Sequence, residues 1–154
     1  MPQFEVSFNS PQCGWMSIGF RDEEKEFHTT TACSPYKTSL KQLLEILTSI
    51  MRGIRGKFVL NWNRDPEEFD FEFTAFESNL LIEIYQYPTP KKDLSQRKLV
   101  YSYLGDIEQV CNAFYRTFRQ LYEDREIDEF ESNWHHPFPL EEFKEFCKLV
   151  EAKR

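Results

Sequence analysis

Apolar residues alternate with polar residues along much of the chain, which is the pattern of half-buried β-strands. Phe4, Val6 and Phe8 fall at every second position, so their side chains share one face of a first strand. The segment 88–92, Pro-Thr-Pro-Lys-Lys, is expected to form an exposed loop. The same alternation predicts six further strands, over residues 15–20, 25–31, 58–62, 69–73, 80–84 and 99–104.

One of these strands departs from strict alternation at its end. Phe69, Phe71 and Phe73 share a face, but Phe76 is out of phase with them. One extra residue in the strand would restore the phase, so we expect a β-bulge near residues 74–75. The connections between strands within each group are short, which indicates an antiparallel meander.

A stripe of apolar residues at helical spacing follows the third strand and runs from Leu40 to Ile54. Ser39 is the expected N-cap, because Gln42 stands three residues further on, as in a capping box. Gly53 is expected to end the helix.

Two more helices are predicted in the last third of the chain. Asp106 is the expected N-cap of a helix whose stripe covers residues 107–122, with Gln109 completing a capping box. A shorter helix is expected over residues 140–150. The order βββ-α-ββββ-α-α predicts an α+β fold, in which amphipathic helices pack on an antiparallel meander sheet. We expect residues 1–154 to form a single α+β domain.

Composition and charge exclude some classes of protein. The 154 residues include 15 phenylalanines, and disordered chains are poor in aromatic residues. The formal net charge is −7, whereas proteins that bind nucleic acids by neutralising phosphates are usually basic. The first residues do not read as a secretory signal, and no apolar run approaches the roughly 18 residues of a membrane span. We therefore expect a cytoplasmic protein that binds neither nucleic acid nor membranes.

Negative charge is concentrated between residues 123 and 131. Such a segment can steer and bind a basic protein, and nearby aromatic side chains would serve as interface anchors. Alternatively, the segment is the solvated end of a helix whose aromatic side chains turn into the core. The candidate partner-binding residues are Glu123, Asp124, Glu126, Asp128, Glu129, Glu131, Phe130 and Trp134.

Histidine and cysteine residues offer the few candidates for catalytic or metal chemistry. His135 and His136 are adjacent, which is not the spacing of a helical metal pair, and the neighbouring prolines favour a surface linker. Cys33 follows His28, and thiol enzymes use a Cys–His pair, but a solvated strand face explains His28 as well. Cys13 and Cys33 flank a predicted hairpin and could form a disulfide, although we expect four reduced thiols.

The fifth predicted strand carries three carboxylates, Glu68, Asp70 and Glu72, on one face. Paired carboxylates perform glycoside hydrolysis, but an apolar inward face and an acidic outward face are typical of a half-exposed sheet. We expect the second arrangement. The chain also lacks the P-loop, G-x-G-x-x-G, G-x-S-x-G and H-E-x-x-H motifs. We therefore expect no cofactor and no metal, and we favour a protein that is not an enzyme.

Two tryptophan motifs carry a resemblance to other proteins. W-x-x-x-P stands at residues 62–66, ahead of the aromatic strand of Phe69 and Phe71, and W-x-x-P-F-P stands at residues 134–139. In these motifs and in the order of its elements, the chain from Trp62 onward resembles small uncharacterised bacterial proteins. The resemblance implies no assigned activity, so no site residue follows from it.

Three functions are consistent with these observations. The leading hypothesis is a small interaction protein, such as an immunity-type inhibitor of a basic partner, since some small acidic bacterial proteins of mixed sheet and helix neutralise toxins. The alternative is a ligand-binding or enzymatic α+β domain, and a homodimer built around its interface is the third. The residues that could line a ligand pocket are Trp15, Trp62, Tyr85, Tyr101 and Tyr103.

Overall fold

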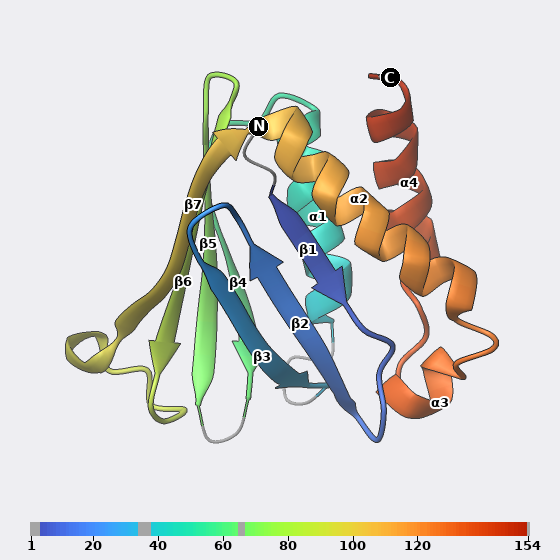
Figure 1. The fold of residues 1–154 in the computed structure, drawn as a ribbon, viewed down its shortest axis with the longest axis horizontal. Helices are drawn as coiled ribbons and strands as arrows, with labels where there is room; N and C mark the ends of the chain where they lie inside the picture. Colours follow the sequence, from blue (N-terminus) through green and yellow to red (C-terminus); the bar gives the residue numbers. More distant parts are fainter. Residues whose placement is uncertain (1–3, 34–37, 65–66, 154) are drawn as a thin grey trace.

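Seven antiparallel strands follow one another through the sheet in chain order (Figure 1). The computed structural model describes residues 4–33, 38–64 and 67–153, so two residues of the W-x-x-x-P motif lie outside the described residues. The predicted α+β fold with an antiparallel meander is confirmed. The strands are β1 (Glu5–Phe8), β2 (Trp15–Arg21), β3 (Glu26–Ala32), β4 (Gly56–Asn63), β5 (Glu68–Phe76), β6 (Asn79–Tyr87) and β7 (Lys98–Asp106), and the short 3-10 helix η1 (Leu94–Gln96) precedes β7.

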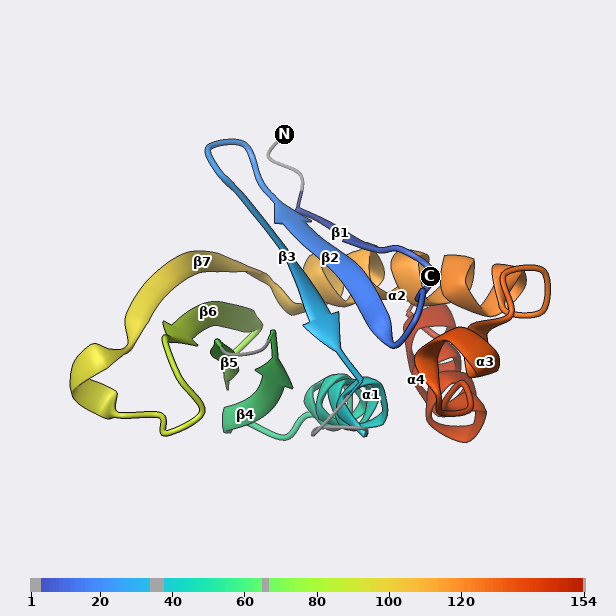
Figure 2. The same ribbon diagram turned by 90° about the horizontal axis from the view of Figure 1, so that it is seen from below.

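The meander is bent between β3 and β4, and its two parts lie at an angle to each other (Figure 2). Ala32 pairs with Asn63 and so links the three-stranded part, β1–β3, to the four-stranded part, β4–β7. Across the bend, the hydroxyl of Tyr101 in β7 donates a 2.8 Å hydrogen bond to Asp22 in the β2–β3 turn. The rings of Phe20 and Tyr101 lie 5.9 Å apart, centre to centre. The core therefore lies in the angle between the two parts.

Four helices complete the fold: α1 (Ser39–Met51), α2 (Ile107–Asp124), α3 (Phe130–Trp134) and α4 (Leu140–Glu151). The helix α2 lies along β1, α1 lies beside β4, and α4 packs against both α1 and α2. No helix within the described ranges is both long and apolar enough to cross a lipid bilayer.

Phe114 of α2 is at the centre of the core and joins the two parts of the sheet. Its ring lies 6.0 Å from Phe20 of β2 and 6.2 Å from Phe73 of β5, both at edge-to-face angles. Phe8 of β1 is 6.3 Å away in the same kind of contact. Aromatic pairs of this geometry contribute roughly 0.5–1.5 kcal/mol beyond the area that they bury. These contacts join the two parts of the sheet through one group of aromatic rings centred on Phe114.

The start of α1 differs from the predicted capping box. Thr38 is the N-cap, and Gln42 Nε2 donates a 3.1 Å hydrogen bond to its hydroxyl oxygen. Ser39 is buried, and its hydroxyl donates to the carbonyl oxygen of Asn61 in β4, 3.0 Å away. The prediction that Ser39 caps the helix is wrong because this hydroxyl binds the helix to the sheet instead. By contrast, Asp106 caps α2 as predicted, accepting bonds from the amides of Glu108 and Gln109.

The end of α1 and the end of β5 also correct the predictions. The helix ends at Met51, before Gly53 with its left-handed φ of +98°, so Ile54 is exposed rather than part of the stripe. The strand β5 pairs without a break with β4 up to Ala75 and with β6 up to Phe76, so no bulge occurs at residues 74–75. Ala75 takes the inward position, and Phe76 is exposed on the other face. The register shift in this half of the sheet lies instead between β6 and β7, where Ile84 pairs with Tyr101 and Tyr85 pairs with Leu99.

Candidate functional site

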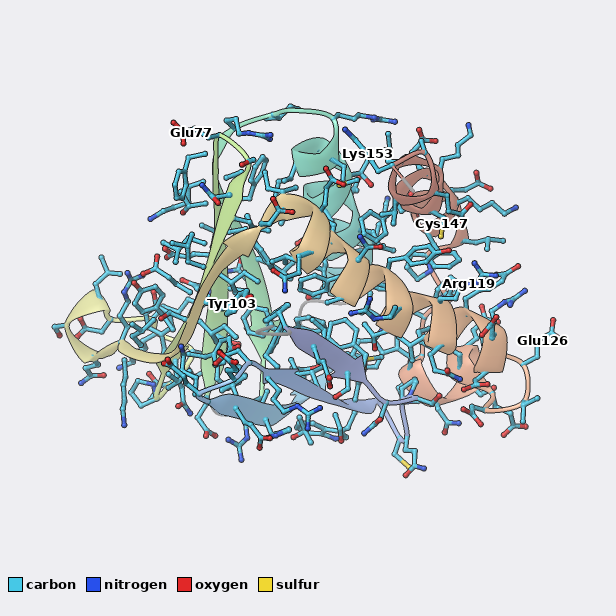
Figure 3. The ribbon with its side chains drawn as sticks, turned by 45° about the horizontal axis from the view of Figure 1, so that its top comes forward. Glu77, Tyr103, Arg119, Glu126, Cys147 and Lys153 are labelled. Carbon is cyan, nitrogen blue, oxygen red and sulfur yellow. The ribbon has the colours of Figure 1, made fainter. Side chains whose placement is uncertain are left out.

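The predicted acidic segment is a surface turn between two helices. It begins in the last turn of α2, crosses a non-helical stretch after Asp124, and ends in the first turn of α3. Glu126 projects outward from this stretch at the edge of the molecule (Figure 3). Arg125, the basic residue of the segment, is turned back onto α2, with its guanidinium 3.9 Å from the centre of the Tyr122 ring. The exposed carboxylates of the acidic segment are those of Glu123, Glu126, Glu129 and Glu131, whereas Asp124 and Asp128 are half-buried.

The two aromatic residues of the candidate site lie in the core. Phe130 is 2% exposed and Trp134 is 1% exposed. The Phe130 ring makes an edge-to-face contact with Phe138 at 5.4 Å. The aromatic side chains are thus turned into the core, as the alternative of a solvated helix end predicts. In this arrangement they support the segment from beneath and do not contribute an exposed anchor.

Ile127 is the apolar side chain that this segment presents to solvent, and its side chain is 84% exposed. Sequence reasoning missed it, because the search was for aromatic anchors. The available signal was a single aliphatic residue between Glu126 and Asp128, within a run of acidic residues. An exposed isoleucine ringed by carboxylates combines an apolar anchor with a charged rim.

A groove of about 540 Å³ opens beside Ile127. Its walls come from the β1–β2 loop and from the acidic segment. The hydroxyl of Ser10 donates a 2.6 Å hydrogen bond to a carboxylate oxygen of Asp128, which ties the two walls together. The side-chain amide of Asn133 donates a 3.0 Å hydrogen bond to the backbone carbonyl oxygen of Asp128 and fixes the turn. The residues that line the groove are Phe8, Asn9, Ser10, Pro11, Gln12, Gln120, Leu121, Asp124, Ile127, Asp128, Glu129 and Asn133.

The carboxylate row of β5 is buried, which corrects the expectation of a solvated acidic face. Glu68, Asp70 and Glu72 are 3%, 9% and 5% exposed. They do lie on the face opposite the phenylalanines, as the alternation predicts. The connection between β6 and β7 reaches back over this face and brings two cations onto it. Lys92 pairs with Asp70 at 2.9 Å, and Arg97 pairs with Glu72 at 3.0 Å.

Asp70 and Glu72 each form ion pairs with cations within the protein. Asp70 accepts hydrogen bonds from the Asn61 amide at 2.7 Å and from the Tyr87 hydroxyl at 2.9 Å, besides its ion pair. Glu72 also pairs with Lys57 at 3.1 Å, and this bond raises the pKa of that lysine. The arrangement neutralises both carboxylates with internal cations, so neither is presented to a substrate as an acid or base.

Arg97 holds the covering connection in place through a second contact. Its guanidinium lies 3.5 Å from the centre of the Tyr85 ring. The hydrogen bond with Tyr87 and, to a smaller extent, the bond with Glu72 raise the pKa of Arg97. Burial and, to a smaller extent, the hydrogen bond with the Glu83 carboxylate raise the pKa of Tyr85. These shifts describe a structural polar network on the outer face of the sheet.

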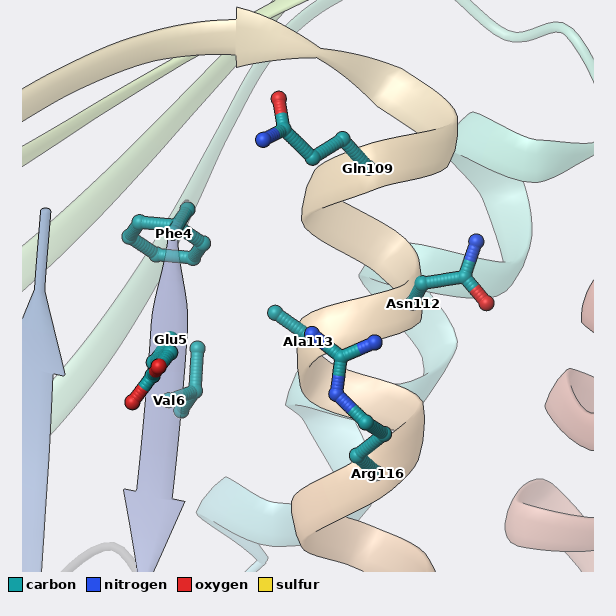
Figure 4. A pocket seen from close by; sticks show the side chains of 7 residues that line it. All are labelled: Phe4, Glu5, Val6, Gln109, Asn112, Ala113 and Arg116. Atoms are coloured by element: carbon teal, nitrogen blue, oxygen red, sulfur yellow. The ribbon is translucent and has the colours of Figure 1, made fainter. Parts of the chain in front are cut away.

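A second groove, of about 530 Å³, lies between β1 and α2 (Figure 4). The side chain of Ala113 points from the helix toward the strand, and the Arg116 guanidinium folds back along the helix. Glu5 lies on the strand side and forms an ion pair with Arg21. Because its lining combines amide groups with charges of both signs, this groove has no electrostatic preference comparable to that of the acidic one.

The structure separates His28 from Cys33 and places a different histidine near that thiol. His28 lies beside Gly19 in the β2–β3 pair and contacts Glu26 at 3.3 Å. Cys33 lies five residues further along, roughly 16 Å at the rise of a strand. The imidazole of His135 instead approaches the turn that Cys33 contacts. The four cysteines are free thiols, and in the part of the chain that the structure describes no three His, Cys, Asp or Glu side chains are grouped to hold a metal ion.

The five aromatic residues proposed for a ligand pocket do not converge. Trp62 and Tyr101 are buried in the core, and Tyr103 packs against it. Tyr85 faces the polar network on the outer side of the sheet. Trp15 is partly exposed on the outward side of β2. Comparison with protein-family models, with curated proteins and with solved structures finds no match for this chain.

Proposed function

We propose that this protein is an interaction module that binds a basic protein partner at the acidic groove between the β1–β2 loop and the α2–α3 segment. An immunity-type inhibitor of a basic toxin is the kind of protein that this proposal describes. The observation that carries it is the exposed Ile127 beside a groove lined by Asp124, Asp128 and Glu129.

The chemistry of the groove indicates the partner. Burying the side chain of Ile127 in an apolar pocket contributes roughly 1.5–3 kcal/mol. The surrounding carboxylates add little affinity while they stay solvated, but they accelerate association with a positively charged surface. The fitting partner therefore presents lysine or arginine side chains around an apolar depression.

Location forms a further part of the proposal. Four free thiols, one of them exposed at Cys13, accord with a reducing compartment such as the cytoplasm.

Affinity capture followed by titration tests the proposal. The immobilised protein is incubated with a lysate of its source cells at low salt, and the bound proteins are identified by mass spectrometry. The recovered partner is then purified and titrated by isothermal calorimetry. We expect a basic partner whose association rate constant, measured by stopped-flow mixing, falls steeply as the ionic strength is raised, because the carboxylates are exposed.

Variants locate the binding surface. Ile127→Ser should raise the dissociation constant by about tenfold, which corresponds to roughly 1.4 kcal/mol. The pair Glu126→Gln, Glu131→Gln should instead lower the association rate constant at low salt by about tenfold, because exposed carboxylates act mainly by steering. The matched control is Glu23→Gln with Glu24→Gln, which removes two exposed charges from the β2–β3 turn and should leave affinity within about twofold. An acidic partner, or a complex indifferent to both groove variants, contradicts the proposal. A homodimer in light scattering whose interface covers Ile127 also contradicts it.

A further inference from the structure

A tight turn precedes β2, and its residue Gly14 is hydrogen-bonded to two segments that lie far from it in the sequence. Gln12 and Trp15 exchange backbone hydrogen bonds of 2.8 and 2.9 Å around Cys13 and Gly14. Both central residues have positive φ, +51° and +80°, which is the geometry of a tight hairpin turn in which glycine is favoured.

Gly14 connects this turn to the end of β3 and to α3. Its carbonyl oxygen accepts a 2.8 Å hydrogen bond from the amide of Cys33. Its own amide donates a 2.5 Å bond to the carbonyl oxygen of Asn133. The backbone therefore fixes the positions of Cys33 and of the residues that end α3 relative to the same point.

The side chains of Cys33 and His135 flank the space where residue 14 has no side chain. A Cβ atom at Gly14 would lie 3.3 Å from Cys33 Sγ and 3.2 Å from His135 Nε2. The thiol and the imidazole thus face one small gap, which only a glycine leaves open. The imidazole is exposed and Cys33 is half-buried, so a small molecule can approach the pair from solvent.

The backbone of His135 is held in a sparsely populated conformation. Its φ is +71°, and its amide donates a 2.8 Å hydrogen bond to the Glu131 carbonyl as the C-cap of α3. Left-handed conformations are disfavoured for residues other than glycine and persist where surrounding structure imposes them. This conformation directs the imidazole toward Gly14 and Cys33.

The remaining thiols have different surroundings. Cys111 is fully buried on α2, and burial raises the pKa of its thiol to about 12. Burial and the nearby Glu151 raise the pKa of the Cys147 thiol to about 11. Both are held as neutral thiols, which are poor nucleophiles. Cys13 is exposed at the tip of the turn and serves as the internal reference.

We propose that Cys33 and His135 form a thiol–imidazole pair that makes Cys33 a site of covalent modification by small electrophiles. In the step, His135 Nε2 accepts the proton of the Cys33 thiol through one solvent water as the sulfur forms a bond to the electrophilic carbon. The leaving group departs as an anion with the electron pair of the bond that breaks. The imidazole then passes its proton to water. This inference is independent of the proposed partner-binding groove.

Site-resolved alkylation tests the pair. The folded protein is treated with iodoacetamide across pH 5–9, and mass spectrometry of peptides gives a rate constant for each cysteine. The products are the thioether, iodide and one proton. We expect Cys33 at pH 7 to react about tenfold or more faster than the exposed Cys13, since a positioned base contributes at least this much. The pH dependence of the rate at Cys33 should differ from that of the rate at Cys13.

Two histidine variants separate a chemical role from a structural one. His135→Asn removes the base but keeps a residue that tolerates positive φ. It should lower the alkylation rate constant of Cys33 about tenfold and leave that of Cys13 within about twofold of its wild-type value. His136→Asn is the matched control and should change neither rate, because His136 lines a different surface, between α1 and α4. Circular dichroism verifies that each variant is folded. Equal rates at Cys33 and Cys13, an unchanged rate in His135→Asn, or an equal loss in His136→Asn overturns the proposal.

Discussion

Tyr101 connects the two parts of the bent sheet, and removing its hydroxyl tests whether that connection stabilises the fold. The hydroxyl donates a 2.8 Å hydrogen bond to Asp22, whose side chain is 6% exposed. A hydrogen bond to a charged acceptor contributes about 1.5–3 kcal/mol, and the loss leaves a buried carboxylate oxygen with only Lys25 at 3.6 Å. We expect Tyr101→Phe to lower the free energy of unfolding by about 2 kcal/mol.

Thermal and urea unfolding measure this effect. For a chain of this length, about 2 kcal/mol corresponds to a fall in the melting temperature of roughly 4–8 °C. Tyr103→Phe is the matched control, since Tyr103 lies two residues along the same strand and its hydroxyl makes no hydrogen bond within the described residues. The control should change stability by less than about 0.5 kcal/mol. A double-mutant cycle with Asp22→Asn should give a coupling energy of more than about 1 kcal/mol.

The pH dependence of the effect follows from Asp22. Burial by itself would raise the pKa of this carboxyl. Hydrogen bonds from the amide of Glu24, the hydroxyl of Tyr101 and the amide of Lys25, with the charge of Lys25, outweigh it and hold the pKa below its ordinary value of 3.8. A carboxyl with a lowered folded-state pKa stabilises the protein above its unfolded pKa, and this stability is lost as pH falls through the folded one. The difference between wild type and Tyr101→Phe should therefore be full at pH 7 and shrink below pH 3.8. A melting temperature within about 1 °C of wild type at pH 7, or a difference that grows in acid, refutes the reasoning.

Three further substitutions test the fold and the candidate sites by urea unfolding. Arg97→Ala should cost about 2 kcal/mol, because it leaves the buried Glu72 carboxylate with only one of its two cations, and Arg97→Lys should recover part of the loss but not the stacking on Tyr85. Gly14→Ala should cost more than Gly53→Ala; both have positive φ, but nothing lies within 4 Å of a Cβ at Gly53, so equal costs contradict the close approach at Gly14. Asp106→Ala should cost about 1 kcal/mol through loss of the α2 cap, and no change contradicts the capping geometry.

Periodicity in the sequence predicted the inward-facing positions of β5 and α2. The alternation at Phe69, Phe71 and Phe73 and the helical stripe around Phe114 all proved to be inward-facing. These predictions succeed because burial of a strand or helix face depends mainly on side chains of that same element. The predicted bulge at residues 74–75 failed for a related reason: Phe76 was assumed to need burial, whereas a single exposed aromatic residue is ordinary on a protein surface.

The candidate sites depended on contacts between distant segments, which periodicity does not contain. Cys33 was paired with His28 because the two lie close in sequence, but the chain brings His135 to Gly14 from more than a hundred residues away. The signal available in the sequence was Gly14 beside Cys13, a dipeptide suited to a tight turn. That signal predicts where the chain reverses, but not which other segment packs against the turn.

The burial of Glu72 shows how the same limit affects the interpretation of charge. Alternation correctly placed its side chain on the outer face of β5, and an outer face was assumed to be solvated. The residues that exclude water from it, Arg97 and Lys92, belong to a connection whose polar sequence indicated an exposed loop. Its backbone is indeed exposed around Pro90, yet its two cations turn inward to the carboxylates. Charge complementarity between a strand and a nearby loop of opposite sign was present in the sequence.

The acidic segment after α2 differs in this respect, because its basic residue, Arg125, is bound to Tyr122 and leaves Glu126, Glu129 and Glu131 exposed to solvent. For this reason we proposed the acidic segment, rather than the carboxylate row of β5, as the surface that binds a basic partner.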